Sequence, residues 1–196
     1  MAQFDIAYSK TGKHEGGYSF RATDRGGETY RGISRKFHSE WKGWAIIDRY
    51  KDKPSFPALL DTDELLQNEV RDFYMQGFWN ILRLNEITDQ DIANELYDTG
   101  VNCGNYQAIK FLQRSLNLLN NKQKLYPDIT VDGFIGVKTL EAVSKVSSDV
   151  SLKDALVICL NGFQFYHYAS LADADKSQEE YFKGWILKRV NLSADV

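Results

Sequence analysis

The chain contains little cysteine, no long apolar run and no excess of positive charge. Its 196 residues include two cysteines, Cys103 and Cys159, which are too few for a disulfide scaffold. No apolar run approaches the roughly 20 residues of a membrane-spanning helix. The segment Met1–Asp5 also lacks the basic start and apolar centre of a signal peptide. We therefore expect a soluble protein that is synthesised in the cytoplasm and carries no export signal of its own.

The charge balance and the histidines exclude further classes of partner. The formal net charge is -3, and no cluster of lysine and arginine with interleaved aromatics forms the footprint that phosphate binding requires. The three histidines, His14, His38 and His167, are dispersed, and no Cys/His/Asp spacing suits a metal ion. The sequence therefore predicts no nucleic acid, no metal and no cofactor, and it leaves the oligomeric state open.

Helical periodicity dominates the second half of the chain. The clearest stripe consists of Ala108, Phe111, Leu112, Ser115, Leu116 and Leu119. Thr88 is expected to cap a helix that carries Ile92 and Leu96 on one face. Two closing helices are expected around residues 152–163 and 181–185. With 43% hydrophobic residues, the composition supports a packed, mainly α protein.

Two carboxylates flank a short glycine-rich segment near the amino terminus. Glu15 is followed by Gly16-Gly17-Tyr18, and nine positions after Glu15 the run Asp24-Arg25-Gly26-Gly27-Glu28-Thr29 begins. Hydrolysis of a glycosidic bond needs one protonated carboxyl group that donates to the leaving oxygen. It also needs one ionised carboxylate that activates water or stabilises the oxocarbenium-like centre. A hairpin that carries this pair therefore indicates a sugar-cleaving site.

The two carboxylates have unlike neighbours. Four residues recur at helical spacing and would share one face of an opening helix: Phe4, Tyr8, Thr11 and Glu15. Such a helix would end at Gly16-Gly17 and hold Glu15 in its last turn, where helix carbonyls and aromatic cover disfavour the ionised form. Asp24 lies in an arginine-flanked turn that favours its charge. Alone, these short strings also fit a solvated helix end and an ordinary turn.

Motifs along nearly the whole chain resemble a known enzyme family. The run from Glu15 to Ser34 resembles the amino-terminal signature of glycoside hydrolase family 108, whose members are lysozyme-like N-acetylmuramidases. Later motifs are similar to the predicted peptidoglycan-binding domain that follows it: Asp98-x-x-Val101-Asn102-x-Gly104, Leu112-Gln113-x-x-Leu116, Val131-Asp132-Gly133-x-Ile135-Gly136-x-x-Thr139-Leu140 and Gly184-Trp185-x-x-Arg189-Val190.

This resemblance implies a fold, two domains and a catalytic residue. The implied fold is mainly α (α+β lysozyme-like), helical with a small β-hairpin at the active site. Residues 1–97 would form the muramidase domain, and residues 98–196 a helical peptidoglycan-binding domain packed closely on it. Glu15 would be the catalytic acid. Proteins of this type are often labelled as secretion activators, which describes a phenotype rather than a chemistry.

Phage-type lysozymes provide a second resemblance. They place a catalytic Glu at the end of their first helix, an Asp nine residues later and a Thr six residues beyond that Asp. Glu15 and Asp24 reproduce the first spacing, but the third position is Tyr30, with Thr29 one residue early. A shift of one residue on a strand reverses the side-chain face. Either a bulge restores Thr29, or Tyr30 supplies the hydroxyl.

Aromatic and polar side chains near these motifs are candidates for substrate binding. A pyranose presents an apolar face that can lie on an aromatic ring, and amide or guanidinium groups can bind the N-acetyl and lactyl groups of muramic acid. The candidates are Tyr18, Arg31, Trp41, Trp44, Asn102, Asn105 and Tyr106. For each aromatic candidate, packing in the core is the alternative, because large rings also dominate cores.

Together these features predict an N-acetylmuramidase that cleaves the β-1,4 bond between N-acetylmuramic acid and N-acetylglucosamine. Glu15 would be the general acid, Asp24 the base or electrostatic stabiliser, and Thr29 or Tyr30 the hydroxyl that orients water. The partner would be glycan strands of bacterial peptidoglycan, in the periplasm or outside the cell, reached after export by a holin or another system. No integral membrane contact is expected. Two alternatives stay open: a lytic transglycosylase, which can work with one acid, and a non-catalytic wall-binding or secretion-associated factor.

Overall fold

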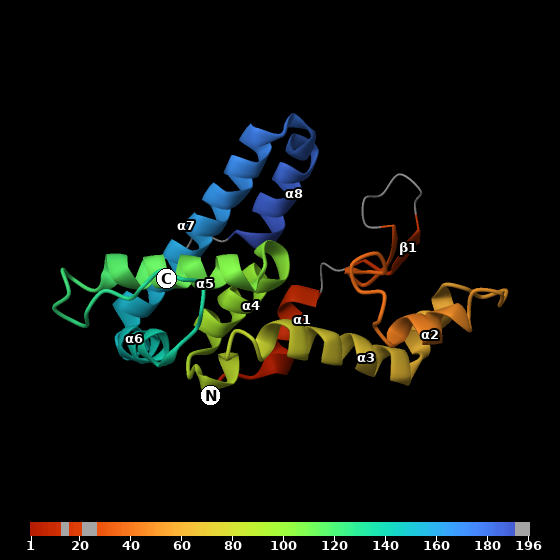
Figure 1. Cartoon of the computed structure of the whole chain (residues 1–196), viewed down its shortest axis with the longest axis horizontal. Coiled ribbons are helices and arrows are strands. Elements are labelled where there is room, and N and C mark those ends of the chain that lie inside the picture. Colours follow the sequence, from red (N-terminus) through yellow and green to blue (C-terminus); the bar gives the residue numbers. More distant parts are fainter. Residues whose placement is uncertain (13–15, 21–26, 191–196) are drawn as a thin grey trace. The chain divides into compact units, whose positions relative to one another are not determined.

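The structure, a computed structural model, describes residues 1–12, 16–20 and 27–190. It divides into two compact units, which are described separately (Figure 1). The larger unit consists of Met1–Thr11 and Phe78–Val196, and the smaller unit consists of Gly12–Gly77. The larger unit therefore combines the first helix of the chain with its carboxyl-terminal part.

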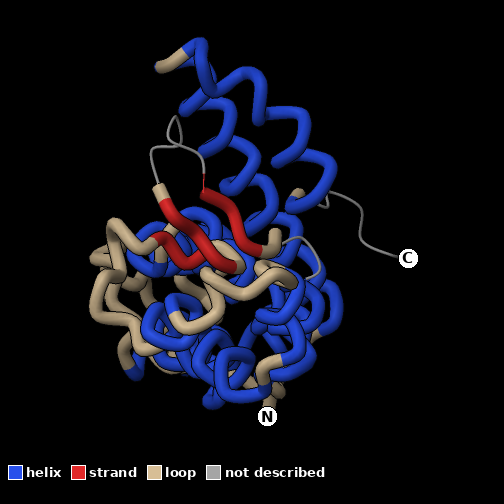
Figure 2. The backbone as a smooth tube through the Cα atoms, turned by 90° about the vertical axis from the view of Figure 1, so that its right-hand side faces the viewer, coloured by secondary structure: helices blue, strands red, loops and turns tan. Residues whose placement is uncertain are grey.

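The smaller unit contains a three-stranded antiparallel sheet and two α-helices. Its elements are β1 (Tyr18–Phe20), β2 (Glu28–Tyr30), β3 (Ile33–Ser34), α2 (Gly43–Asp48), the 3-10 helix η1 (Ala58–Thr62) and α3 (Glu64–Tyr74). The strands lie in the order β1-β2-β3, as Figure 2 shows. Tyr18 pairs with Tyr30, and Tyr30 pairs with Ile33. The predicted hairpin is therefore present, with one more strand than expected.

The core of the smaller unit includes a residue of β2 and one face of α3. Tyr30 is fully buried at the end of β2. On α3, Leu66, Val70 and Tyr74 recur at helical spacing and are buried. The Asp63 carboxylate caps this helix by accepting a hydrogen bond from the Leu66 backbone N–H at 2.9 Å. The helix is followed by the short π-helical turn η2 (Met75–Trp79).

The larger unit is helical. Its elements are α1 (Phe4–Gly12), the 3-10 helix η3 (Leu84–Glu86), α4 (Gln90–Cys103), α5 (Asn105–Leu119), α6 (Val137–Ser147), α7 (Val150–Ala174), the 3-10 helix η4 (Lys176–Gln178) and α8 (Glu179–Arg189). Helix α4 packs against both α5 and α7, and α8 packs back along α7 (Figure 1). The two closing helices predicted from the sequence are α7 and α8.

Helix α4 is the most enclosed element of this unit. Its buried residues are Ile92, Ala93, Asn94, Leu96, Tyr97, Thr99 and Gly100. The predicted face with Ile92 and Leu96 is confirmed, but the predicted cap is wrong. The helix begins at Gln90 because the Asp89 carboxylate, rather than Thr88, accepts hydrogen bonds from the backbone N–H groups of Asp91 and Ile92 at 3.0 Å.

The predicted stripe on α5 is also buried. Five of its six residues face the interior, namely Ala108, Phe111, Leu112, Ser115 and Leu116, whereas Leu119 is partly exposed. These helices and the small sheet confirm the predicted mainly α class. Within residues 1–12, 16–20 and 27–190, no helix is long and apolar enough to cross a membrane.

The expected boundary between residues 97 and 98 falls inside α4. Since α4 packs against α5 and α7, cutting the chain there divides one packed helix. The assignment of 1–97 and 98–196 as functional domains therefore stays a prediction. The contacts within the chain instead separate residues 12–77 from the rest.

We expect a fragment ending at Tyr97 to lose cooperative folding. It retains half of α4 and lacks α5 and α7, so the buried face formed by Ile92 and Leu96 would be exposed to water. Thermal unfolding by circular dichroism, with the full chain as the reference, would measure this. A soluble fragment with a cooperative transition and full activity would contradict it.

Candidate functional site

The two predicted catalytic carboxylates, Glu15 and Asp24, lie outside the described residues. The helix that leads to Glu15 along the chain is described as α1. Two residues of its predicted face, Phe4 and Thr11, are buried. Phe4 packs edge-on against Tyr97, with ring centroids 5.8 Å apart. The described part of α1 is therefore packed in the larger unit through Phe4 and Thr11.

The pairing of β1 with β2 places the two candidate hydroxyls, those of Thr29 and Tyr30, on opposite faces of the sheet. Ser19 pairs with Thr29 and Tyr18 pairs with Tyr30, in continuous register along β1 and β2. Thr29 and Tyr30 therefore point to opposite faces of the sheet. The Thr29 hydroxyl donates to the Gly27 carbonyl at 3.4 Å, and its side chain is partly exposed.

Tyr30 is held by the core of the smaller unit. Its hydroxyl lies 3.3 Å from the Leu60 carbonyl and 3.3 Å from the Asp61 carboxylate, and it accepts a hydrogen bond from Gln67 Nε2 at 2.9 Å. Burial raises the pKa of this phenol. A fully buried ring with these partners has a structural role. Of the two hydroxyls, Thr29 has the side chain that solvent can reach.

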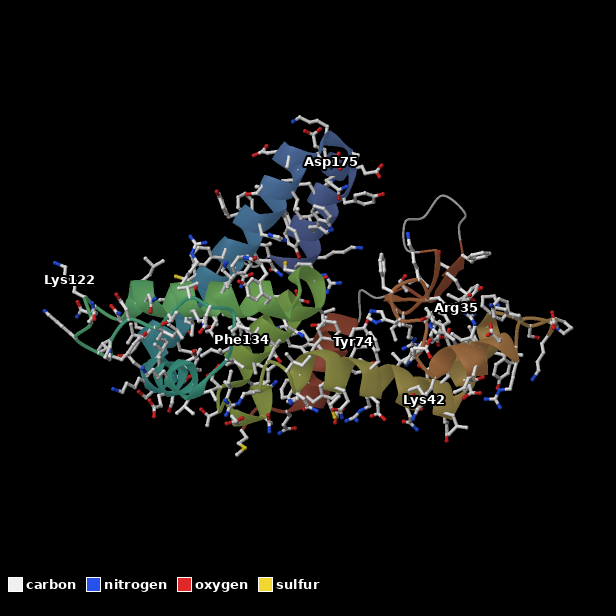
Figure 3. All side chains as sticks on the ribbon, in the orientation of Figure 1. Arg35, Lys42, Tyr74, Lys122, Phe134 and Asp175 are labelled. Atoms are coloured by element: carbon white, nitrogen blue, oxygen red, sulfur yellow. The ribbon has the colours of Figure 1, made fainter. Side chains whose placement is uncertain are left out.

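Sequence reasoning missed a charged cluster around Glu28. The Glu28 side chain is 10% exposed and accepts hydrogen bonds from Tyr18, Arg35 and Lys51 at 3.0, 3.0 and 2.7 Å. Burial opposes its ionisation, but these three donors outweigh burial and lower the Glu28 pKa. Arg35, labelled in Figure 3, also forms a bidentate pair with Asp48 at 2.6 and 2.7 Å.

This cluster fixes the hairpin rather than supplying a free acid. Glu28 is ionised and engaged on every side by donors that come from β1, from the segment after β3 and from the segment after α2. The hydroxyl of Tyr18, a predicted substrate ligand, is one of those donors. No local sequence signal links Glu28 to Lys51, because the two residues are far apart along the chain.

The other predicted ligands of the smaller unit have structural partners. Arg31 forms an ion pair with Asp61 at 3.1 Å. Trp44 is 2% exposed, and its indole N–H donates to the His38 carbonyl at 2.8 Å, so it belongs to the core. Trp41 is partly exposed, and its ring covers Gly43.

The predicted ligands of the larger unit lie around the junction of α4 and α5. Asn102 is exposed and donates to the Asp98 carbonyl and carboxylate at 2.8 and 3.2 Å. Asn105 packs against Gly100. Tyr106 is 56% exposed, and its ring lies over Gly133. Tyr106 is therefore the accessible aromatic residue among the predicted ligands of this unit.

Residues 132–134 of the loop between α5 and α6 are held by a buried amide. Gln113 is 1% exposed and donates to Asp132 Oδ1 at 2.8 Å and to the Phe134 carbonyl at 3.0 Å. Its oxygen accepts from the backbone N–H groups of Asp132 and Gly133, each at 3.0 Å. The fixed loop presents Phe134, which is 73% exposed and is labelled in Figure 3. Tyr106 and Phe134 thus frame Gly133 as a small aromatic surface.

Helix α4 also brings acidic groups into the larger unit. Burial, and next the charge of Asp98, raise the pKa of Glu95 to about 8. Among the described atoms, Glu95 Oε1 has no hydrogen-bond partner and almost no exposed surface. Asp98 forms an ion pair with Arg189 at 2.8 Å. From the sequence, Asp98 belongs to a motif, whereas Glu95 is not singled out.

The described part of the chain offers no evident metal centre. Over residues 1–12, 16–20 and 27–190, no group of three or more His, Cys, Asp and Glu side chains could hold a metal ion. Both cysteines are free, as predicted. Burial raises the pKa of Cys103 to about 11, so its thiol is protonated and unreactive at neutral pH.

Two family models match the chain in succession. The model described as Glycosyl hydrolase 108 matches residues 8–104, and the model described as Predicted Peptidoglycan domain matches residues 107–190. The chain carries a family 108 glycosyl hydrolase domain followed by a predicted peptidoglycan domain. The family 108 domain includes Glu15, Asp24 and the whole small sheet, and Tyr106 lies at the junction of the two domains.

A solved structure, that of Brucella abortus SagA, is similar to the chain with a TM-score of 0.63 and 22% sequence identity. The match covers 94% of this chain and 87% of that chain, so the fold is shared over nearly the whole length. Comparison with curated proteins gave no match. A glycosyl hydrolase domain joined to a peptidoglycan domain identifies the protein as a glycoside hydrolase directed at peptidoglycan.

We predict that Glu95→Gln stabilises the protein more at pH 8 than at pH 5. The folded-state pKa of Glu95, about 8, lies above the ordinary value of 4.5. Between these two values the folded state keeps a proton that the unfolded state has lost, so folding stability falls as the pH rises from the ordinary value to the folded value. The amide has no such charge. Unfolding temperatures across this pH range would measure the difference, with the exposed Glu141→Gln as a matched control. A constant difference at all pH values would contradict the assignment.

Proposed function

We propose that the protein is an N-acetylmuramidase that cleaves the β-1,4 bond between N-acetylmuramic acid and N-acetylglucosamine. The observation that carries this proposal is the family 108 match over residues 8–104, which includes the Glu15-Gly16-Gly17-Tyr18 run. Glu15 is the proposed general acid. Asp24 is the proposed base or electrostatic stabiliser, because glycoside hydrolysis needs an ionised carboxylate beside the acid.

Thr29 is the proposed water-orienting hydroxyl. The choice of Thr29 is supported by its position, because it faces the other side of β2 and is partly exposed, whereas the Tyr30 hydroxyl is buried and bonded to Gln67 and the Leu60 carbonyl. Among the described residues, the Thr29 hydroxyl donates to the nearby Gly27 carbonyl at 3.4 Å, which is long for a hydrogen bond between oxygens. It can therefore turn toward water.

The Glu28 cluster supports this site indirectly. Its three donors tie β1, β2 and the segments after β3 and α2 into one charged network. A catalytic hairpin needs such rigidity, because catalysis depends on placing the reacting groups within a fraction of an ångström. Glu28 is already ionised and surrounded by donors, so it is a poor candidate for the acid.

The predicted peptidoglycan domain supplies the proposed wall-binding surface. Tyr106 and Phe134 are both exposed: the Tyr106 ring lies against Gly133, Phe134 is the next residue, and the Gln113 amide fixes residues 132–134. A fixed aromatic surface costs little entropy on binding and fits the apolar face of a sugar ring. The protein would act at the cell wall, on peptidoglycan glycan strands.

The first test is Glu15→Gln. The amide keeps the shape of the side chain but cannot donate a proton, so hydrolysis of purified peptidoglycan should fall by about 10²- to 10⁴-fold while wall binding is retained. The exposed Glu40→Gln, which lies outside the proposed site, is the matched control. Wild-type activity in correctly folded Glu15→Gln would remove Glu15 from the mechanism.

The second test addresses the aromatic surface. Phe134→Ala should weaken co-sedimentation with peptidoglycan by about 3- to 10-fold, the size expected for loss of one aromatic contact. Because Phe134 is 73% exposed, its removal should leave the unfolding temperature unchanged. Leu118→Ala, on α5 and 71% exposed, is the control for loss of an exposed apolar side chain. Equal binding by the two variants would exclude Phe134 from the wall-binding surface.

A further inference from the structure

The guanidinium of Arg189, on α8, lies at the carboxyl end of α1. The last carbonyls of a helix lack partners within the helix and carry partial negative charge. The Arg189 guanidinium, at the end of α8, lies beside one of them: Nη1 is 3.5 Å from the Thr11 carbonyl oxygen. A cation at this position stabilises the end of a helix.

The guanidinium is held in place by Asp98 of α4. Arg189 Nη1 donates to Asp98 Oδ1 at 2.8 Å, and the two side chains are only 8% and 17% exposed. Asp98 Oδ2 also accepts from Asn102 at 3.2 Å and lies 3.5 Å from Gln164 Nε2 of α7. A buried pair with further hydrogen bonds has a single favourable geometry. Helices α1, α4, α7 and α8 therefore meet at this pair.

The nearby Glu95 carboxyl affects the charge of this junction. It faces Asp98 on the same helix and Lys10 on α1, and Asn161 and Thr99 interact with it. With Glu95 protonated, the buried part of the junction contains one carboxylate and one guanidinium. Among the described residues, Arg189 therefore pairs with the Asp98 carboxylate and also lies beside the end of α1.

We propose that Arg189 is a positioning residue for hydrolysis, because it anchors the end of α1 from which the chain continues to Glu15. Thr11 lies four positions before Glu15. Thr11 belongs to the family 108 domain and Arg189 to the predicted peptidoglycan domain. The second domain therefore serves catalysis as well as wall binding. This inference rests on the proposed role of Glu15 as the acid.

The test uses the full chain with the pair replaced by neutral groups of similar shape. The double variant Asp98→Asn with Arg189→Gln removes both members of the ion pair together, so neither charge is left buried without the other, and the fold should be kept. We expect kcat to fall about tenfold or more, since small displacements of a catalytic group have effects of this size. KM and wall binding should change by less than about twofold, because the proposed wall-binding surface consists of Tyr106 and Phe134 rather than of this pair. The single variant Arg189→Lys, which keeps the cation, should have a kcat between those of the wild type and the double variant.

A second measurement does not depend on activity. Amide hydrogen exchange at the end of α1, at Thr11 and Gly12, should become faster in the double variant, because the anchor of that helix end is lost. Lys188→Gln removes a cation from the neighbouring exposed position of α8 and should change neither kcat nor exchange.

The outcomes separate this inference from the proposed function. Wild-type kcat in the folded double variant would overturn the positioning role, as would equal loss of kcat and wall binding. Wild-type activity in Glu15→Gln would instead overturn the proposed acid. In that case, unchanged exchange at Thr11 and Gly12 would also overturn the anchoring of α1, and faster exchange would support it.

Discussion

The enclosure of α4 is the constraint on which the larger unit depends. Its face with Ile92, Leu96 and Tyr97 is buried, and α5 and α7 pack on it. A polar residue on the packed side of such a helix is taken out of water and then needs a partner. Asp98 finds Arg189, whereas Glu95 is best accommodated as a neutral acid. The Asp98–Arg189 pair thus ties α8 to α4.

In the smaller unit, hydrogen bonds between distant segments give a short sheet its rigidity. Strands of two or three residues are not stable through the backbone hydrogen bonds between them alone. Tyr30 inserts its ring into the core and is bonded through its hydroxyl to the segment around Leu60, and Glu28 collects three donors. These contacts make the hairpin a firm platform for the proposed site.

The sequence predicted the features that depend on local periodicity. The stripe on α5, the face of α4 and the mainly α class follow from helical spacing, and the structure confirms them. The cap at Thr88 was wrong because either of two adjacent polar residues could cap the helix, and only the geometry selects Asp89. The partners of Glu28 and Arg189 lie far away along the chain, so no local pattern could indicate them. The roles of Glu15 and Asp24 came from resemblance and stay predictions.

The central claim is that water cleaves the glycan after N-acetylmuramic acid. Its most direct test is digestion of purified peptidoglycan in ¹⁸O-labelled water, followed by mass spectrometry of the released fragments. The account predicts fragments with a reducing N-acetylmuramic acid end that has incorporated the label. Unlabelled fragments with an anhydro end would indicate a lytic transglycosylase, and binding without any released fragment would indicate a non-catalytic wall protein; either result would contradict the account.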